Sequence, residues 1–193
     1  KAAVDYLDGE GRKLGFKGVL WVASNWNWDA AQAAEEGFAA TCAYNYGTDG
    51  YKLGRNIAEN LRRAEVSHGL YAIPTVSVGF DSLPWHGQRH PLMTDENLAT
   101  ALRWCRDEYV PDHAKKGTWQ ADTYWLSTWN EYGEGTYIMP TDDARGFAYL
   151  DAVRAVFTDE PVDRSLDLLP TAAQRARMCR LYCPSEKGKS ECP

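Results

Sequence analysis

Two glutamates, Glu131 and Glu134, follow a strand-like run in the segment YWLSTWNEYGEGTYIMPT, residues 124–141. The apolar and aromatic residues up to Trp129 are typical of a strand that packs on a core. The run after Trp129 contains asparagine, glycine and proline, which bend a backbone and direct side chains toward a common point. Two neighbouring carboxyl groups are what the cleavage of a glycosidic bond requires. We therefore predict that Glu131 and Glu134 form a catalytic pair.

The residues around the two acids favour this hypothesis over its alternative, in which both are solvated loop residues. Trp129, Tyr132, Tyr137 and Ile138 make the neighbourhood partly apolar, and burial favours the protonated form of a carboxyl group. One protonated and one ionised carboxyl group form an acid–base pair. We expect the two acids to converge on one cavity with unequal affinities for a proton.

The elements that position these acids alternate between strand-like and helix-like runs, which is typical of βα units on a parallel sheet. Four such units are half of a (β/α)8 TIM barrel, which typically needs about 250 residues. We therefore predict an α/β chain of the TIM-barrel type, present as a half-barrel fragment. A half-barrel that pairs with a second copy and an open sheet are the alternatives. The strand-like runs are 18–24, 38–46, 70–80 and 124–129, and the helix-like runs are 30–36, 51–69, 95–109 and 144–157.

Local signals mark the ends and the buried faces of these runs. Pro74 lies inside the third strand-like run, where its missing N–H requires a bulge or a strand start. Thr94 is expected to cap the N-terminus of the third helix, because acidic residues follow it in the first turn. In the last helix, the residues expected to be buried are Phe147, Leu150, Val153 and Phe157.

Polar and aromatic residues gather where the four strands end, which is where βα proteins place functional groups. Such residues suit a sugar, because its ring stacks on Trp and Tyr while its hydroxyl groups bond to Asn, Asp and His. The alternatives are that the aromatic residues fill the core and that Asp81 caps a turn. The predicted substrate-binding residues are Trp26, Trp28, Tyr44, Asn45, Tyr46, Asp81, Trp85, His86, Asn130, Tyr132 and Tyr137.

The sequence predicts neither a metal site nor a cofactor. His86 and His90 are four residues apart, but Pro84, Gly87 and Pro91 prevent the helix that would bring their side chains onto one face. A pair of histidine ligands is therefore not expected in this loop.

The five cysteines fall into two groups. Cys42 and Cys105 lie in apolar periodic runs and are expected to be small buried residues. Cys179, Cys183 and Cys192 lie near the end of the chain, where a disulfide or a metal is conceivable. No fourth ligand stands at a zinc-like spacing there, so the oxidation state of these three residues stays open.

The composition argues against two classes of partner. Lys and Arg number 21 against 27 Asp and Glu, and the resulting net charge of −6 does not favour nucleic-acid phosphates or an anionic membrane surface. No run approaches the roughly 18 apolar residues that span a bilayer. An apolar share of 44% is that of a globular protein with a core.

The pattern divides the chain into two parts. Residues 1–157 are expected to form the half-barrel, and residues 158–193 a surface helix with a flexible tail. The first residues resemble the end of a helix and include no initiator methionine, so we expect a larger coding sequence. Because no signal peptide is visible, the localisation stays open; a hydrolase would be secreted or periplasmic.

The motif STWNEYGEGTYIMPT, followed by GFAYLDAVR, resembles glycoside hydrolase family 99 and the wider family-99-like group, including WbsX-type glycosyltransferase-like proteins. The pattern of that group is Trp-Asn-Glu-Trp-x-Glu-Gly, with a proline a few residues later. The segments AYNYG and PTVSVGFDSLPW also resemble later strands of these proteins. The resemblance covers about residues 15–157, and the tail has no counterpart in it.

The resemblance implies a (β/α)8 barrel of which this chain is the carboxyl-terminal half. It implies a retaining α-glycosidase in which Glu131 takes the proton of the substrate's own 2-hydroxyl group and Glu134 is the acid for the leaving oxygen. The intermediate would be a 1,2-anhydro sugar. Two positions depart from the mannosidase form, because Tyr132 stands for a tryptophan and Gly133 for a histidine. Mannose specificity is therefore not implied.

Three functions follow from these patterns. The first is hydrolysis of an α-linked oligosaccharide or polysaccharide by the carboxylate pair. The second is a glycosyltransferase-like role in polysaccharide biosynthesis, which the absence of an Asp-x-Asp motif disfavours. The third is a non-catalytic carbohydrate-binding module. The missing amino-terminal half of the barrel or a second copy is the expected protein partner, and without it the chain would lack much of its cleft.

Overall fold

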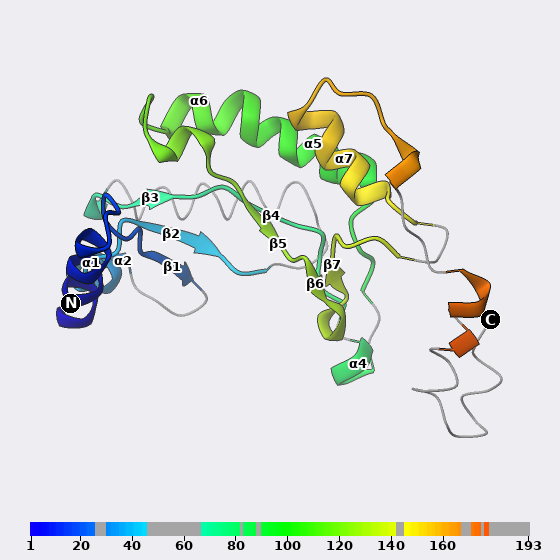
Figure 1. The fold of residues 1–193 in the computed structure, drawn as a ribbon, viewed down its shortest axis with the longest axis horizontal. Helices are drawn as coiled ribbons and strands as arrows, with labels where there is room; N and C mark the ends of the chain where they lie inside the picture. Colours follow the sequence, from blue (N-terminus) through cyan, green and yellow to red (C-terminus); the bar gives the residue numbers. More distant parts are fainter. Residues whose placement is uncertain are drawn as a thin grey trace.

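The computed structural model describes residues 1–25, 30–45, 67–81, 83–87, 90–141, 145–166, 171–174 and 176–177, and shows a mixed α/β chain (Figure 1). The strands β1, β2 and β3 run from the side of α1 toward the middle of the molecule, where the antiparallel hairpin of β6 and β7 lies (Figure 1). The α/β class predicted from the sequence is therefore confirmed. The half-barrel stays a prediction.

Parallel strands form two small sheets. In the first sheet, β1 (Val22–Asn25), β2 (Ala40–Ala43) and β3 (Tyr71–Ala72) lie in the order β1-β2-β3. In the second, β4 (Thr75–Ser77) pairs with β5 (Trp125–Ser127). Both pairings of the first sheet and the pairing of the second are parallel, as predicted. Each strand is shorter than its predicted run.

Pro74 explains why the third strand-like run is split into β3 and β4. Proline has no N–H to donate to a ladder, and its carbonyl oxygen instead accepts from Trp125 N at 3.1 Å. On the other side, Thr75 Oγ1 accepts from Ala43 N at 3.0 Å, so a side chain replaces the ladder bond to β2. The run therefore changes partner at Pro74, from β2 before it to β5 after it.

Helices alternate with these strands along the chain, in the order that the sequence predicted. The predicted helix over residues 30–36 is confirmed, whereas residues 51–66 of the second predicted helix lie outside the described residues. The helices are α1 (Ala2–Lys13), α2 (Ala30–Glu36), α4 (Leu83–His86), α5 (Asp95–Trp104), α6 (Val110–His113) and α7 (Ala148–Phe157), with the short turns η2 (Trp119–Asp122) and η4 (Arg164–Leu166).

The long helix across the top of Figure 1 joins α5 to α6 through the π-helical turn η1 (Cys105–Tyr109). Thr94 caps it as predicted, since its side chain accepts a hydrogen bond from Asn97 N at 3.1 Å. Leu98 and Leu102 are fully buried against Val76 of the second sheet. Burying such a leucine stabilises the fold by about 1.5–3 kcal/mol, so α5 is a main support of β4 and β5.

Helix α7 packs on α5 through a different face from the one predicted. Its buried residues are Tyr149, Ala152 and Val156, whereas Phe157 is 38% exposed. Tyr149 was not among the residues expected to be buried, but its ring is buried and its hydroxyl donates to the Met93 carbonyl oxygen. A satisfied hydroxyl lets a tyrosine join a core, and this turns the buried face by one residue, roughly 100° around the helix.

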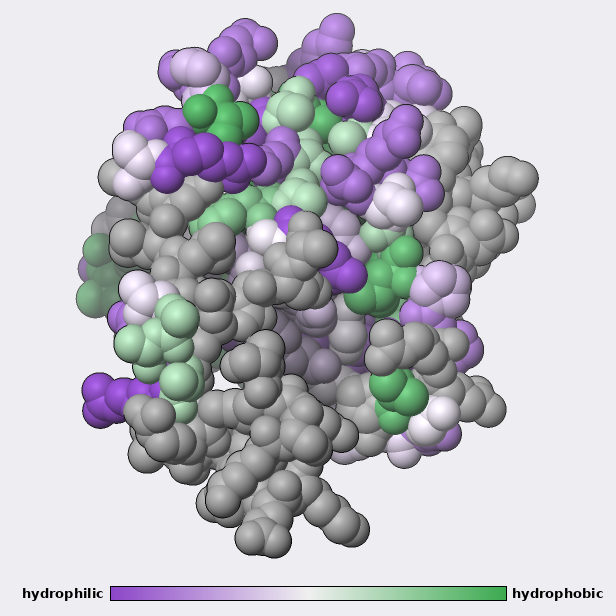
Figure 2. Space-filling view, turned by 90° about the vertical axis from the view of Figure 1, so that its right-hand side faces the viewer, coloured by the Kyte–Doolittle hydropathy of each residue, from purple (hydrophilic) through white to green (hydrophobic). Residues whose placement is uncertain are grey.

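The predicted tail lies largely outside the described residues. Residues 158–166, 171–174 and 176–177 are described; η4 is a short helical turn, and residues 172–174 and 176–177 are also helical. Cys179, Cys183 and Cys192 are outside the described ranges. On the face shown in Figure 2, the coloured apolar side chains are scattered among polar ones. None of the helices in the described part combines the length and hydropathy that crossing a membrane requires.

Cys42 and Cys105 are buried free thiols, as predicted. Burial raises the pKa of Cys42 to about 11 and that of Cys105 to about 12, and a protonated thiol is a poor nucleophile. With Cys179, Cys183 and Cys192 replaced by serine, we expect no reaction with a thiol-specific disulfide reagent until the protein is unfolded. Because an unfolded thiol ionises near 9.0, stability should fall as pH rises above that value. Rapid labelling of the native protein would contradict this burial.

Candidate functional site

The two predicted catalytic glutamates lie on a small hairpin that follows β5. It consists of β6 (Asn130–Glu131), the 3-10 turn η3 (Tyr132–Glu134) and β7 (Thr136–Tyr137), and the two strands are antiparallel. The sequence predicted a bent turn here and missed the pairing. Gly135 closes the turn in the left-handed region at φ 61°, which glycine adopts without strain.

Two threonines attach this hairpin to the end of β5. Thr128 Oγ1 donates to the Thr136 carbonyl oxygen and accepts from Glu131 N at 3.2 Å. Thr136 Oγ1 in turn donates to the Ser127 carbonyl oxygen at 3.1 Å. Thr136 and Ser127 are buried, so these bonds lie away from competing water and fix the backbone of the first acid.

Two consecutive residues at the end of β2 contact the two acids. The Tyr44 hydroxyl group is hydrogen-bonded to Glu131, and Asn45 Nδ2 donates to Glu134 Oε2 at 3.5 Å. The structure thus brings four of the predicted site residues together, although their segments are about ninety residues apart in the chain. Figure 1 shows the same convergence, with the end of β2 directed toward the hairpin of β6 and β7.

The oxygen of the Asn45 side-chain amide is hydrogen-bonded to a residue that the sequence analysis missed. Ser77 Oγ at the end of β4 donates to Asn45 Oδ1 and accepts from Gly79 N at 3.1 Å. With its oxygen bound in this way, the amide presents its NH2 group to Glu134. Ser77 and Asn45 are both buried. The alternation of small polar residues along β4 was the available signal, since Thr75 and Ser77 share one face of the strand.

The pKa of Tyr44 reports the two negative charges beside it. Partial burial raises this pKa, and the charge of Glu134, the charge of Glu131 and the hydrogen bond to Glu131 raise it further. Each of these effects disfavours a phenolate. At neutral pH Tyr44 is therefore a hydrogen-bond donor to the acid pair.

A tryptophan lies over the turn between the two acids. Trp85 on α4 is 66% exposed, and a Cβ atom built on Gly133 would come within 3.2 Å of its ring. The ring thus occupies the space that a side chain at position 133 would need. His86 lies exposed on the same short helix. The structure therefore places the exposed Trp85 ring against the turn that contains Gly133 and Glu134.

Asp81 supports the hairpin through its backbone and caps a turn through its side chain. Its N–H donates to the Glu134 carbonyl oxygen at 2.8 Å. Its Oδ1 accepts from Leu83 N and His90 N, each at 3.1 Å. These contacts are those of the turn-capping alternative. A direct bond from Asp81 to a substrate stays a prediction.

Tyr132 and Tyr137 stack against each other across the hairpin, with ring centroids 5.0 Å apart. Tyr132 is 50% exposed and its hydroxyl contacts Met139 Sδ, while Asn130 is exposed. Trp26, Trp28 and Tyr46 lie outside the described residues. Within the described ranges, no group of three or more His, Cys, Asp or Glu side chains could hold a metal ion.

Comparison with known proteins gives no family for this chain, so a functional assignment depends on the geometry of the site. No family model matches the chain, and no curated protein matches it significantly.

Tyr44→Phe tests whether the Tyr44 hydroxyl group positions Glu131. A hydrogen bond to a charged group contributes about 1.5–3 kcal/mol, so turnover of a substrate by the acid pair should fall by at least about tenfold. Ultraviolet difference titration should also show the loss of one phenol with a raised pKa, while Tyr124, whose pKa burial also raises, is retained. Tyr6→Phe is the control, because Tyr6 is exposed on α1. Identical titration curves for Tyr44→Phe and the parent protein would contradict the placement.

Proposed function

We propose that the chain is part of a glycoside hydrolase that cleaves an α-linked glycan with Glu131 and Glu134. The observation that carries this proposal is the pair of contacts from adjacent residues, Tyr44 to Glu131 and Asn45 to Glu134. These contacts turn both carboxyl groups toward the carboxyl end of the parallel strands, where βα proteins collect functional groups. Paired carboxyl groups at such a place suit acid–base cleavage of a sugar acetal.

The neighbours of each acid support different roles. The Tyr44 hydroxyl group donates to Glu131 and so orients this carboxyl group for the role of a base in the proposal. Asn45 bonds to one oxygen of Glu134, Oε2, and leaves Oε1 for contact with the leaving group in this proposal. In this proposal Glu131 draws a proton from the sugar's 2-hydroxyl group, and Glu134 gives one to the leaving oxygen.

The aromatic residues beside the acids support a carbohydrate substrate. Trp85 and Tyr132 are both exposed and flank the turn that holds Glu134. Sugars present flat faces of C–H groups that stack on such rings. A tryptophan exposed by two thirds would otherwise leave a large apolar surface in water.

The architecture proposed for the whole enzyme is a (β/α)8 barrel of the family-99-like type. The parallel strands follow chain order, β1-β2-β3 in the first sheet and β4-β5 in the second, as the strands of half of such a barrel do. An open parallel sheet leaves both edge strands unpaired. The other half, or a second copy of this chain, would cover these edges and complete the cleft.

Turnover by the product of the full coding sequence tests the function. A panel of aryl α-glycosides and α-linked glycans should include a substrate, and NMR of the first-formed product should show retained configuration. The same protein should show no transfer from nucleotide sugars. Calorimetry of the Glu131→Gln and Glu134→Gln variants separates catalysis from binding. Oligosaccharide binding without turnover in the parent protein would make the chain a carbohydrate-binding module and overturn the proposal.

A further inference from the structure

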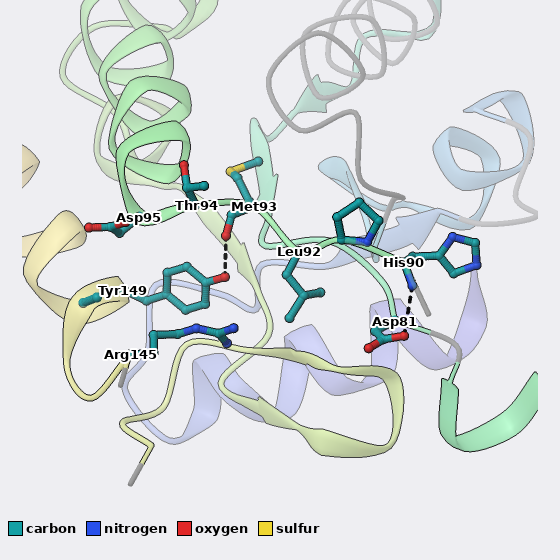
Figure 3. Close-up of a pocket in the computed structure, with 10 residues that line it drawn as sticks. Asp81, His90, Leu92, Met93, Thr94, Asp95, Arg145 and Tyr149 are labelled. Atoms are coloured by element: carbon teal, nitrogen blue, oxygen red, sulfur yellow. Dashed lines mark hydrogen bonds between the residues drawn. The ribbon is translucent and has the colours of Figure 1, made fainter. Parts of the chain in front are cut away.

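A second site lies beside the acid hairpin. A cavity of about 370 Å3 opens between the loop that joins β4 to α5 and the start of α7 (Figure 3). This volume falls within the range of small-molecule sites, about 300–1,000 Å3. Its lining residues are Asp81, His90, Pro91, Leu92, Met93, Thr94, Asp95, Arg145, Ala148 and Tyr149.

We infer that this cavity binds a sugar unit that carries a carboxylate, such as a hexuronate, with Arg145 as the group that recognises the carboxylate. The inference rests on the proposed function for its place in the glycan, since it names the class of substrate that the same cleft accepts. The binding itself is testable without catalysis.

Arg145 is held in place by two aromatic rings. Its guanidinium carbon lies 4.9 Å from the centroid of the Tyr149 ring and 5.6 Å from that of Tyr137. Tyr149 is itself fixed, because it is buried and its hydroxyl donates to the Met93 carbonyl oxygen. A planar guanidinium held between rings loses little freedom on binding and presents parallel N–H groups that match the two oxygens of a carboxylate.

The opposite end of the cavity suits hydroxyl groups. Asp81 and His90 lie there, and Figure 3 shows the side chain of Leu92 between them and Arg145. An acidic sugar has this same order of groups, with a carboxylate at one end, hydroxyl groups at the other and an apolar ring face between them. The His90 N–H bond to Asp81 Oδ1, 3.1 Å long, keeps the two polar residues together.

The two acids in the lining decide against an inorganic anion as the occupant. Asp81 and Asp95 are both lining residues, although Figure 3 shows Asp95 pointing away from Arg145. Both acids would repel a phosphate, which carries nearly two negative charges, more strongly than a single carboxylate. A phosphate also has no apolar surface that could pack against Leu92. With one positive group and two acids in its lining, the cavity fits a hydroxylated ligand with a single negative charge better than a doubly charged anion.

The cavity adjoins the hairpin that carries the acid pair. Tyr137, on which Arg145 lies, stacks on Tyr132, the residue that directly follows Glu131. At the other end, Asp81 N–H is bonded to the Glu134 carbonyl oxygen at 2.8 Å. A glycan that places its scissile bond at Glu131 and Glu134 would therefore place a neighbouring unit against Arg145. The net charge of −6 would otherwise disfavour an acidic glycan.

Binding of glucuronate and of glucose to the whole chain tests the inference. The two sugars differ in a carboxylate against a hydroxymethyl group, and NMR titration measures a Kd for each. We expect glucuronate to bind at least about tenfold more tightly, as a charge-assisted bond predicts. Arg145→Gln should remove this preference, whereas Arg145→Lys should keep part of it. Arg154→Gln on the same helix is the matched control, because Arg154 contacts Pro161 outside the cavity.

Leu92→Trp is the second variant, since it fills the cavity and leaves Arg145 unchanged. It should weaken the binding of both sugars while thermal unfolding shows a folded protein. Equal affinities for the two sugars, a preference that survives Arg145→Gln, or inorganic phosphate that binds more tightly than glucuronate would each overturn the inference. Glu131→Gln with Glu134→Gln should keep the glucuronate preference. Its persistence in a protein without turnover separates failure of the proposed function from failure of this site.

Discussion

Glutamine at position 131 or 134 is expected to lower kcat by about 10²–10⁴-fold, which is the usual contribution of a positioned acid or base. Glutamine keeps the size and the hydrogen-bonding oxygen of glutamate but can neither release nor accept the proton. Asn45 and Tyr44 should still contact the two side chains, so the fold and the substrate affinity should change little. The measurement is steady-state turnover of the substrate found in the glycoside panel.

The leaving group distinguishes the two positions. If Glu134 gives a proton to the leaving oxygen, Glu134→Gln should slow substrates with poor leaving groups more than activated aryl glycosides. Glu131→Gln should slow both kinds similarly. Glu160→Gln is the control, because this glutamate is exposed after α7. Parent-like rates in both site variants would remove the hairpin from the chemistry.

Alanine at Gly135 is expected to disrupt the same hairpin without touching either carboxyl group. The Cβ atom would lie 2.6 Å from Asp81 Cβ, and the residue would have to keep φ at 61°. A left-handed alanine costs about 1 kcal/mol, and the overlap should cost about 1–3 kcal/mol more. The Asp81 loop must move away, which loses the bond from Asp81 N–H to the Glu134 carbonyl oxygen. A displacement of about 1 Å at Glu134 is enough to lower turnover about 10²-fold.

Gly87→Ala provides a matched comparison for this substitution. Gly87 has a φ of 67°, close to that of Gly135, but a Cβ atom there would meet nothing within 4 Å. Both variants therefore carry the same backbone strain, and only Gly135→Ala carries the overlap with Asp81. Chemical denaturation should show the larger loss of stability for Gly135→Ala. Equal losses in the two variants would mean that Asp81 does not pack on the hairpin as described.

The sequence predicted best those elements that depend on neighbouring residues. The Thr94 cap follows from neighbouring residues, and the parallel pairing of β1, β2 and the run through Pro74 follows from the alternation of strand-like and helix-like runs; both were found. Even the difficulty at Pro74 had the expected cause, a missing donor that ends one ladder and begins another. The buried face of α7 was misjudged because it depends on a partner for the Tyr149 hydroxyl group, and this partner lies on another segment.

The sequence predicted several of the residues that form the site, but it did not predict which of them contact one another. Tyr44, Asn45, Glu131 and Glu134 were selected because each follows a strand, and the structure brings them together. Ser77 and Arg145 were missed because their roles arise from residues distant in the chain, Asn45 for one and the rings of Tyr137 and Tyr149 for the other. The cavity lined by Leu92 leaves no pattern in the sequence, since its walls come from separate loops.

The change of partner at Pro74 gives this junction an influence on chemistry far from it. Tyr44 and Asn45 follow β2 of the first sheet. Glu131 and Glu134 lie on the hairpin that follows β5 of the second sheet, and residues 73–74 join the two sheets. The relative tilt of the sheets therefore sets how closely donors and acids approach. Because the proline ring fixes one backbone torsion, this junction is stiff. It therefore limits how far the distance between the donors and the two acids can vary.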